Sequence, residues 1–241
     1  MATSRHFDEE LRTLKERLLQ MGSLAEKALH RAVGALVERD EARLSDLADL
    51  ERQVNALEIE VDDRAFTALV KRQPVASDLR FVVMSIKIAG DIERISDLAV
   101  NIARSTERLL AEPPLKKLVL TPMLTERVVA MLRESLDAFV RGDADLARAV
   151  IASDDGVDSM RDDMVRSLLT YMMEDPYTIS RALTLVLIAQ NLERVADHAT
   201  NIAEEVVYMV EAREMRHGFH TGKIVGHGEP LAPPPPQEKR P

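Results

Sequence analysis

The feature that most constrains this chain is a stretch of sequence that occurs twice. Residues 91–103 read DIERISDLAVNIA and residues 191–203 read NLERVADHATNIA, with Glu, Arg, Asp, Asn, Ile and Ala at equivalent places. The match extends upstream, where Pro74 corresponds to Pro176. Each copy spans about 100 residues, which is enough for a core of its own. The sequence therefore predicts a tandem duplication.

Apolar residues in both copies have the spacing of a buried helix face. They recur at alternating steps of four and three residues, at Ile88, Ile92, Ile95, Ala99 and Ile102 in the first copy and at Ile188, Leu192, Val195, Ala199 and Ile202 in the second. Aromatic residues make up only 3% of the chain and there are 9 glycines, which disfavours a β-sandwich or barrel. The predicted fold class is all-α.

Prolines and softer breaks divide each copy into three helices. Before the last twelve residues, prolines occur at positions 74, 113, 114, 122 and 176, and a proline ends a continuing helix. With further breaks at Asp40 and Gly142, the sequence predicts six helices, over residues 7–39, 41–72, 76–110, 122–141, 143–174 and 178–214. We expect two antiparallel three-helix bundles side by side, in residues 1–112 and 113–216, and a disordered proline-rich tail in 217–241.

The repeated segment places an acidic pair on one helix face in each copy. The two carboxylates are four residues apart, at Glu93 and Asp97 and again at Glu193 and Asp197. Like charges at this spacing destabilise a helix by roughly 0.2–0.5 kcal/mol per pair, so each pair needs a compensating interaction. Arg94 and Arg194, three residues before each Asp, could supply it as ordinary surface ion pairs.

A second polar pair is predicted to face the first across each helical hairpin. The hairpins turn near Pro74 and Pro176, and residues equally distant from a turn lie at the same height. This register brings together Glu51, Asn55, Glu93 and Asp97 in the first copy, and Asp154, Asp158, Glu193 and Asp197 in the second. Converging carboxylates repel one another, and a hard cation is the simplest compensation. From the residues alone, a cation site and a set of surface ion pairs both remain open.

The composition restricts what else the chain can do. There is no Cys, which excludes disulfides, thiolate nucleophiles and iron–sulfur clusters. The formal net charge of −9 disfavours binding to nucleic acid. The sequence contains neither a phosphate-binding loop nor a dinucleotide fingerprint, and it starts without an apolar signal segment. We therefore expect a cytoplasmic protein that is not an enzyme.

The chain resembles the PhoU family over about residues 5–214. The resemblance rests on the duplicated three-helix unit, the ERxxD motif in both copies, the segment from Pro74 to Arg80 and the opening HFDEELRTLKERLLQMGSLAEKAL. It implies a regulator of high-affinity phosphate transport that restrains the transporter when phosphate is plentiful. The implied partners are the ATPase subunit of the phosphate ABC transporter and a sensor histidine kinase, with membrane association only through them. The resemblance also implies a homodimer.

The resemblance extends to metal binding, because some members of the family bind iron or zinc clusters through paired E(D)xxxD motifs. It implies metal ligands at the eight positions named above, with Fe or Zn as the first expectation and Mn, Mg or Ca as alternatives. Asn55 is a neutral ligand, and Leu98 stands where the second copy has His198. We therefore expect the second site to be the stronger one.

Two other functions stay as alternatives at this point. One is a carboxylate-bridged di-iron oxidoreductase of the ferritin-like kind, which needs two facing Glu-x-x-His motifs. The sequence has this spacing at one place, from Glu214 to His217. The other is a helical scaffold that binds no metal.

Overall fold

Seven α-helices and two 3₁₀ turns make up almost all of residues 2–115 and 120–212, the part of the chain described by the computed structural model. The elements are α1 (Ala2–Glu38), η1 (Glu41–Leu44), α2 (Leu47–Arg72), α3 (Ala76–Leu110), α4 (Leu120–Arg141), α5 (Ala144–Ala152), α6 (Asp154–Glu174), η2 (Pro176–Thr178) and α7 (Ile179–Glu211). The described residues include no strand, and the predicted all-α class is confirmed. The predicted tail at 217–241 lies outside the described residues.

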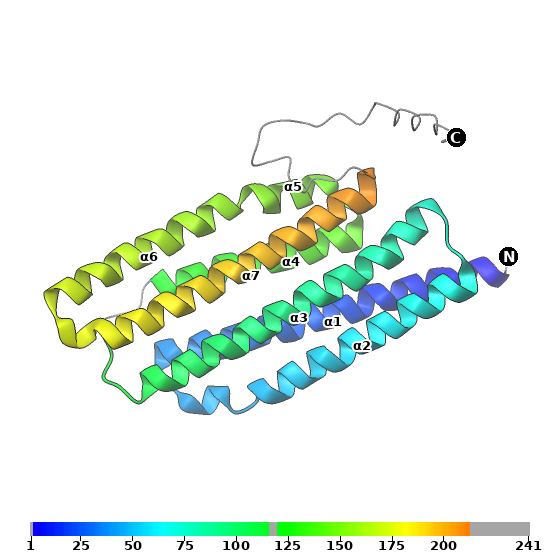
Figure 1. Ribbon diagram of the computed structural model, residues 1–241. Coiled ribbons are helices and arrows are strands. Elements are labelled where there is room, and N and C mark those ends of the chain that lie inside the picture. Colours follow the sequence, from blue (N-terminus) through cyan, green and yellow to red (C-terminus); the bar gives the residue numbers. More distant parts are fainter. Residues whose placement is uncertain (1, 116–119, 213–241) are drawn as a thin grey trace, which may run out of the picture.

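Four long helices form the centre of the molecule, and the remaining helices cover its two sides (Figure 1). α1 and α7 each pack against both α3 and α4. α2 covers α1 and α3, whereas α5 and α6 pack against α7 and α4. The first repeat is thus the predicted three-helix bundle, and the second has the same arrangement with its middle helix divided into α5 and α6; the two bundles lie side by side. None of the described helices is both long and apolar enough to span a membrane.

The two bundles share one hydrophobic core. The ten apolar residues that periodicity singled out on α3 and α7 are all 0% exposed. They belong to the same cluster of buried side chains as residues of α1, α2, α4 and α6. Full burial of an Ile or Leu side chain is worth about 1.5–3 kcal/mol. The two repeats are therefore packed together as one unit. The expected domain boundary at 112/113 falls in the connection between α3 and α4.

Polar contacts fix the antiparallel register of α3 against α7. Lys87 Nζ lies 3.1 and 3.3 Å from the two carboxylate oxygens of Glu205, which is buried. One helical turn along α3, Asp91 Oδ1 lies 2.8 Å from His198 Nδ1. Both pairs cross from one repeat to the other. A slip of one helical turn would separate both pairs and leave Glu205 buried without this cation, which is costly.

An arginine near the start of each of these two helices bonds to a carbonyl oxygen at the end of the contact. Arg80, near the start of α3, donates through Nε to the carbonyl oxygen of Met209 at the end of α7, at 3.1 Å. Arg181, near the start of α7, donates through Nη1 to the carbonyl oxygen of Pro113, just after α3, at 2.9 Å. A cation beside the last carbonyls of a helix also interacts favourably with the helix dipole. Arg80, part of the motif noted in the sequence, therefore holds the two repeats together.

The turn after the first helix of each repeat has the same backbone in both copies. Arg39 and Gly142 occupy equivalent positions with positive φ, at 56° and 64°. The Asp that follows each of them caps the next helical element by accepting a backbone N–H. In the first repeat, that element is only the short turn η1, and α2 begins six residues later than the predicted start at 41. The capping signal was visible in the sequence, but the length of the capped element was not.

The prediction of one helix over residues 143–174 was wrong, because Ser153 interrupts it. Ser153 ends α5 and precedes α6, and its Oγ donates to the carbonyl oxygen of Val150 at 2.8 Å. A hydroxyl that bonds to the backbone competes with the helical hydrogen bonds. Asp154 and Asp155 follow in the first turn of α6, where negative charge is favourable. Periodicity alone did not reveal this break.

Replacing His198 by Leu is expected to destabilise the contact between repeats. The change leaves Asp91, whose side chain is only 15% exposed, without its imidazole partner. We expect the free energy of unfolding in urea to fall by about 1–3 kcal/mol. The double variant Asp91→Asn/His198→Leu, which carries the residue types found at the equivalent positions 191 and 98, should recover part of this loss. A double variant as unstable as the single one would contradict this account.

Candidate functional site

The four acidic positions of the second repeat lie where α6 and α7 meet. Burial raises the pKa of Asp154 above its ordinary value, and the carboxylates of Asp197 and Asp158 raise it further. The pKa of Glu193 is raised by burial, then by Asp197, Asp158 and Asp154. Such mutual effects require carboxylates on the two helices to lie near one another. The structure therefore brings these four residues into one acidic cluster, the second-repeat cluster.

Arg161 stands among the carboxylates of this cluster. Its guanidinium lies 3.3 Å from Asp158 and 3.9 Å from Glu193. It lowers the pKa of Glu193 and of Asp197, although by less than burial and the neighbouring acids raise them. A cation of the protein itself thus offsets part of the repulsion. Arg161, which follows Asp158 by three residues on α6, was not predicted as part of this site.

In the first repeat, the acidic side chains around Glu93 and Asp97, which we call the first-repeat cluster, include one that was not predicted. Burial raises the pKa of Glu93, and Asp97 and Glu58 raise it further. The pKa of Glu58 is raised in turn by burial, by Asp62 and by Asp97. Glu58 is therefore a neighbour of Glu93 on α2 that the sequence did not predict. Arg94 lowers the pKa of both Glu58 and Glu93, as the surface ion-pair interpretation anticipated.

Counting residues from the turn missed Glu58 for a simple geometric reason. Glu58 and Glu93 differ by three residues in their distance from Pro74, which is about 4.5 Å along a helix axis. Two Glu side chains can span that difference. A signal was present in the sequence, because an acidic or amide residue recurs at steps of four, three and four along one face of α2, at Glu51, Asn55, Glu58 and Asp62.

Asn55 has an unsatisfied side-chain oxygen on this face. Its Oδ1 is buried and has no hydrogen-bond partner. A buried acceptor without a partner costs about 1–3 kcal/mol. A cation or a donor at this position would therefore be favourable, which is consistent with the predicted role of Asn55 as a neutral oxygen ligand.

The two clusters differ most at one pair of equivalent positions. Glu51 and Asn55 correspond to Asp154 and Asp158, so the residue three places further on is Glu58 in one repeat and Arg161 in the other. The same place holds a carboxylate in the first cluster and a guanidinium in the second. The first cluster is consequently the more negative of the two in this respect.

Both clusters offer oxygen atoms suited to a metal ion, but to different degrees. Carboxylate and amide oxygens suit Mg²⁺, Ca²⁺ and Mn²⁺, and they also bind iron and zinc. In the first repeat, Glu58, Glu93 and Asp97 supply carboxylate oxygens and Asn55 Oδ1 has no hydrogen-bond partner; these are the atoms that would hold such an ion. In the second, Arg161 would have to move aside. No three Asp, Glu or His side chains of the described residues already lie close enough together to hold an ion, so binding requires side-chain rotation.

His198 is engaged in the contact between repeats. Its Nδ1 lies 2.8 Å from Asp91 Oδ1, and Asn201 also contacts this carboxylate oxygen, at 3.5 Å. The imidazole lowers the pKa of the adjacent Asp197, after burial and Asp158 have raised it. His198 was expected to strengthen metal binding in the second repeat. In the structure its imidazole also contacts Asp91 on α3.

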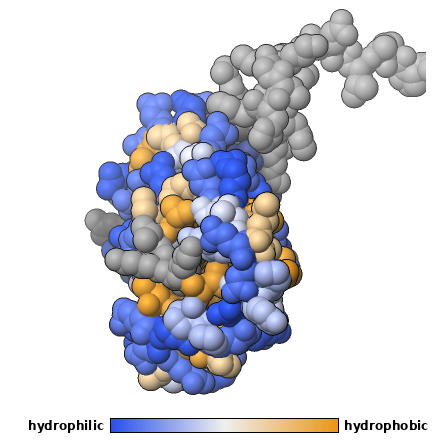
Figure 2. All heavy atoms as spheres, turned by 90° about the vertical axis from the view of Figure 1, so that its left-hand side faces the viewer, coloured by the Kyte–Doolittle hydropathy of each residue, from blue (hydrophilic) through white to orange (hydrophobic). Residues whose placement is uncertain are grey.

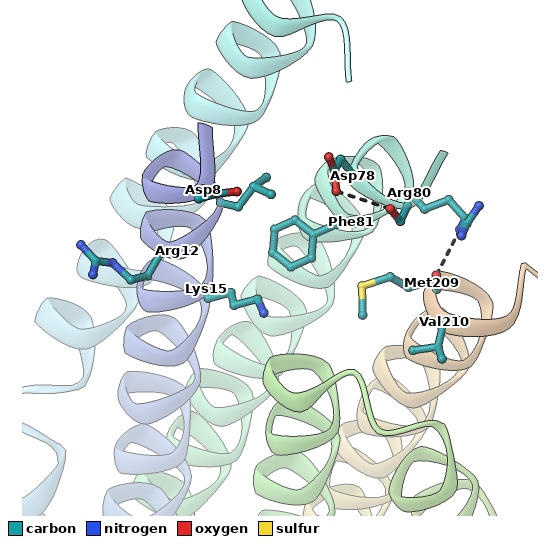
Figure 3. A pocket seen from close by; sticks show the side chains of 10 residues that line it. Asp8, Arg12, Lys15, Asp78, Arg80, Phe81, Met209 and Val210 are labelled. Carbon is teal, nitrogen blue, oxygen red and sulfur yellow. Dashed lines mark hydrogen bonds between the residues drawn. The ribbon is translucent and has the colours of Figure 1, made fainter. Parts of the chain in front are cut away.

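A cleft of about 510 Å³ lies where α1, α3 and α7 meet, at the junction of the repeats (Figure 3). Two of its basic side chains contact neutral groups: Arg80 bonds to the carbonyl oxygen of Met209, and Lys15 bonds to that of Val140 at 3.1 Å. Lys15 Nζ also lies 5.3 Å from the centre of the Phe81 ring. These contacts join one repeat to the other, so we interpret this cleft as part of the structural junction.

Two segments of the chain, residues 18–106 and 123–206, match the PhoU domain family, one in each bundle. The chain belongs to the PhoU family. It is 40% identical over 215 residues to the phosphate-specific transport system accessory protein PhoU homolog of Pseudomonas aeruginosa, which covers 89% of each chain. It is 34% identical over 214 residues to the phosphate-specific transport system accessory protein PhoU of Escherichia coli, again over 89% of each chain.

Solved structures of PhoU proteins have the same fold. The crystal structure of PhoU from Pseudomonas aeruginosa matches with a TM-score of 0.82 and 40% identity, over 86% of this chain and 100% of that one. The phosphate transport system regulatory protein PhoU from Streptococcus pneumoniae matches with a TM-score of 0.73 and 25% identity, over 91% of this chain and 99% of that one. The family resemblance inferred from the sequence is confirmed.

Removing one carboxylate from the second-repeat cluster should stabilise the metal-free protein at neutral pH. The folded-state pKa of Asp197 is raised, so the native state binds this proton more tightly than the unfolded chain does. The destabilisation is therefore present above the raised pKa and is relieved as the pH falls through it toward the ordinary value of 3.8. We expect Asp197→Asn to increase the free energy of unfolding at neutral pH by about 0.2–0.5 kcal/mol.

Urea unfolding in the presence of a chelator, repeated across the acidic and neutral range, would measure this gain. The difference from wild type should shrink as the pH falls. Glu107→Gln, an exposed position on α3 outside both clusters, serves as the matched control and should leave stability at neutral pH unchanged. A constant gain at every pH would show that the repulsion is not its cause.

Proposed function

We propose that this chain is an accessory protein that restrains phosphate uptake and represses the phosphate-starvation response when phosphate is plentiful. The observation that carries this proposal is the family match in both bundles, together with relatives 34–40% identical that are named as phosphate-specific transport system accessory proteins. The relatives and this chain cover one another over most of their lengths. The whole described fold, rather than one module of it, supports the assignment.

The proposed action is binding without catalysis. The protein contacts the ATPase subunit of the phosphate ABC transporter and a sensor histidine kinase, acts in the cytoplasm as a homodimer, and reaches the membrane only through these partners. Long helices with exposed outer faces and a net charge of −9 suit docking onto partner helices with basic side chains.

The interior gives little support to the alternative of a di-iron oxidoreductase. Such enzymes hold their metal with inward-pointing carboxylates in the core of a four-helix bundle. Among the described residues, Glu205 is the one acidic side chain in the buried core, and Lys87 neutralises it. Both acidic clusters lie instead at contacts with the outer helices α2 and α6.

Each acidic cluster is proposed to bind a metal ion that joins two helices of its bundle. Iron or zinc is our first expectation, with Mn, Mg or Ca as alternatives. The ligands are the predicted eight residues, with Glu58 added in the first repeat. Since Arg161 already offsets charge in the second cluster and Asn55 has an unsatisfied oxygen in the first, we now expect the first site to bind more tightly.

Deleting the gene tests the regulatory role. We expect genes of the phosphate-starvation response to be expressed constitutively in high phosphate, because the transporter and kinase lose their restraint. Transcript levels of these genes in high and low phosphate would measure this, with the wild-type gene restored in trans as the control. Normal repression by phosphate in the deletion strain would contradict the proposal.

Elemental analysis tests the metal sites. Protein purified without chelator should contain metal, and Glu93→Ala/Asp97→Ala should lose more of it than Glu193→Ala/Asp197→Ala does. Circular dichroism should show nearly unchanged helical content in both variants, since these side chains lie at outer helix contacts. Wild-type protein with no metal above background would rule out the sites, and loss of helical content would show that the carboxylates are structural.

A further inference from the structure

The second-repeat cluster contains a cation of the protein's own that joins its two helices. Arg161, on α6, has one guanidinium nitrogen, Nη2, that lies 3.3 Å from Asp158 on the same helix and 3.9 Å from Glu193 on α7. A metal ion held by this cluster would join the same two helices through the same carboxylates. Arg161 therefore already makes the connection that we propose for the metal.

The guanidinium of Arg161 is held in the cluster mainly by charge. Its Nη1 lies 3.3 Å from Asp162, and the side chain is 29% exposed. Burial and neighbouring acids raise the pKa of Glu193 and of Asp197, and Arg161 lowers both. Its Nε is buried and has no hydrogen-bond partner among the described residues. Because a buried donor without a partner is costly, a competing cation can displace this side chain more easily than a fully bonded one.

The acidic excess of the α6–α7 hairpin lies around Arg161 and not at the turn. Residues 154–163 contain five acidic side chains and one basic side chain, that of Arg161. Residues 166–190, which include the turn, contain two acidic and two basic side chains. Figure 2 views the molecule from the end with this turn and shows hydrophilic residues interspersed with apolar ones there. Arg161 is therefore placed where a positive charge offsets the most repulsion.

The first-repeat cluster meets its charge differently. Glu58 stands at the position equivalent to Arg161. Burial raises the pKa of Glu58 and of Glu93 most, and Arg94 lowers both. Arg94, however, pairs with residues of its own helix, at 3.6 Å to Glu93 and 4.0 Å to Asp97, and its side chain is 66% exposed. Water screens exposed ion pairs, so they contribute little. The first-repeat cluster thus keeps a need for a cation that Arg161 already meets in the second.

We propose that Arg161 is a built-in counter-ion that competes with metal for the second-repeat cluster. Without metal it holds α6 against α7, and a metal ion binds there only by displacing it. The first-repeat cluster, with Glu58 at the equivalent position, takes up metal at lower concentrations. This inference rests on the proposed metal sites, whereas the role of Arg161 in the metal-free protein rests on its contacts alone. The residue at this one position therefore decides which bundle responds to metal first.

The binding test uses the full-length chain, stripped with a chelator and then titrated with Zn²⁺ in a calorimeter. The background Glu93→Ala/Asp97→Ala removes the first-repeat cluster and isolates the second. In this background, we expect Arg161→Gln to lower the Kd for Zn²⁺ at least about tenfold, because residues around a metal site change its affinity by about 10–100-fold. With both clusters intact, Glu58→Arg should weaken the tighter Zn²⁺ site by a similar factor.

Two further variants serve as controls. Arg161→Lys keeps the positive charge, so it should bind Zn²⁺ as weakly as the parent protein does. Arg166→Gln makes the same substitution on the same helix, at an arginine that is 68% exposed and pairs with Asp163 outside the cluster. It should leave the Kd unchanged. Circular dichroism confirms that each variant is folded.

A second readout needs no metal. With chelator present, Arg161→Gln should lower the Tm by at least about 2 °C, because carboxylates of α6 and α7 then repel one another without a cation between them. Adding Glu193→Gln should recover part of this loss, since it removes one of the repelling charges. A wild-type Tm in Arg161→Gln would show that this guanidinium does not hold the two helices together, which overturns the inference.

The outcomes separate this inference from the proposed metal sites. If wild-type protein binds no Zn²⁺, the metal sites fail and the competition fails with them. If wild type binds Zn²⁺ but Arg161→Gln binds it no more tightly than its parent, only the role of Arg161 is wrong. Tight binding by Arg161→Lys would show that positive charge is not the competitor, which also overturns the inference. If Arg161→Gln does not fold, Glu58→Arg decides, and an unchanged Kd would overturn the inference.

Discussion

The antiparallel contact between α3 and α7 is the interaction on which the rest of the structure depends. The apolar stripes of both helices are completely buried, and they belong to one core that spans both repeats. Lys87 and Asp91 fix the register by pairing with Glu205 and His198. Since Glu205 is buried, removing Lys87 would destabilise the fold by more than the Lys87–Glu205 ion pair stabilises it. The contact thus specifies one alignment and excludes slipped ones.

This central contact determines where charged function can lie. Because α3 and α7 bury one face against each other and further apolar side chains against α1 and α4, their acidic pairs lie at the edges, against α2 and α6. Desolvation there is partial, and the pKa values of Glu93, Asp154, Glu193 and Asp197 are raised mainly by it and by one another. The duplication placed a cluster in each repeat, and the exchange of Glu58 for Arg161 made their electrostatics different.

The two hairpin turns show the same divergence on the surface. Both repeats keep the turn proline, at Pro74 and Pro176, and both expose apolar side chains near it. The charges beside the prolines differ, with Lys71 and Arg72 in one turn and Glu174 and Asp175 in the other. In Figure 1 the two turns lie at opposite ends of the molecule. The duplicated fold thus varies the charges beside its turn prolines while both copies keep their buried apolar stripes.

The sequence by itself determined the repeat, the all-α class and the helix over residues 76–110, which matches α3, because periodicity and proline positions are local properties. It also located the paired carboxylates, since residues four apart on a helix share a face. Only the tertiary structure decided which α2 residue faces Glu93, because helix rotation and side-chain reach are not fixed by counting from Pro74. It also decided that Ser153 interrupts a helix and that His198 pairs with Asp91, since both depend on contacts with carbonyl or carboxylate groups that spacing does not reveal.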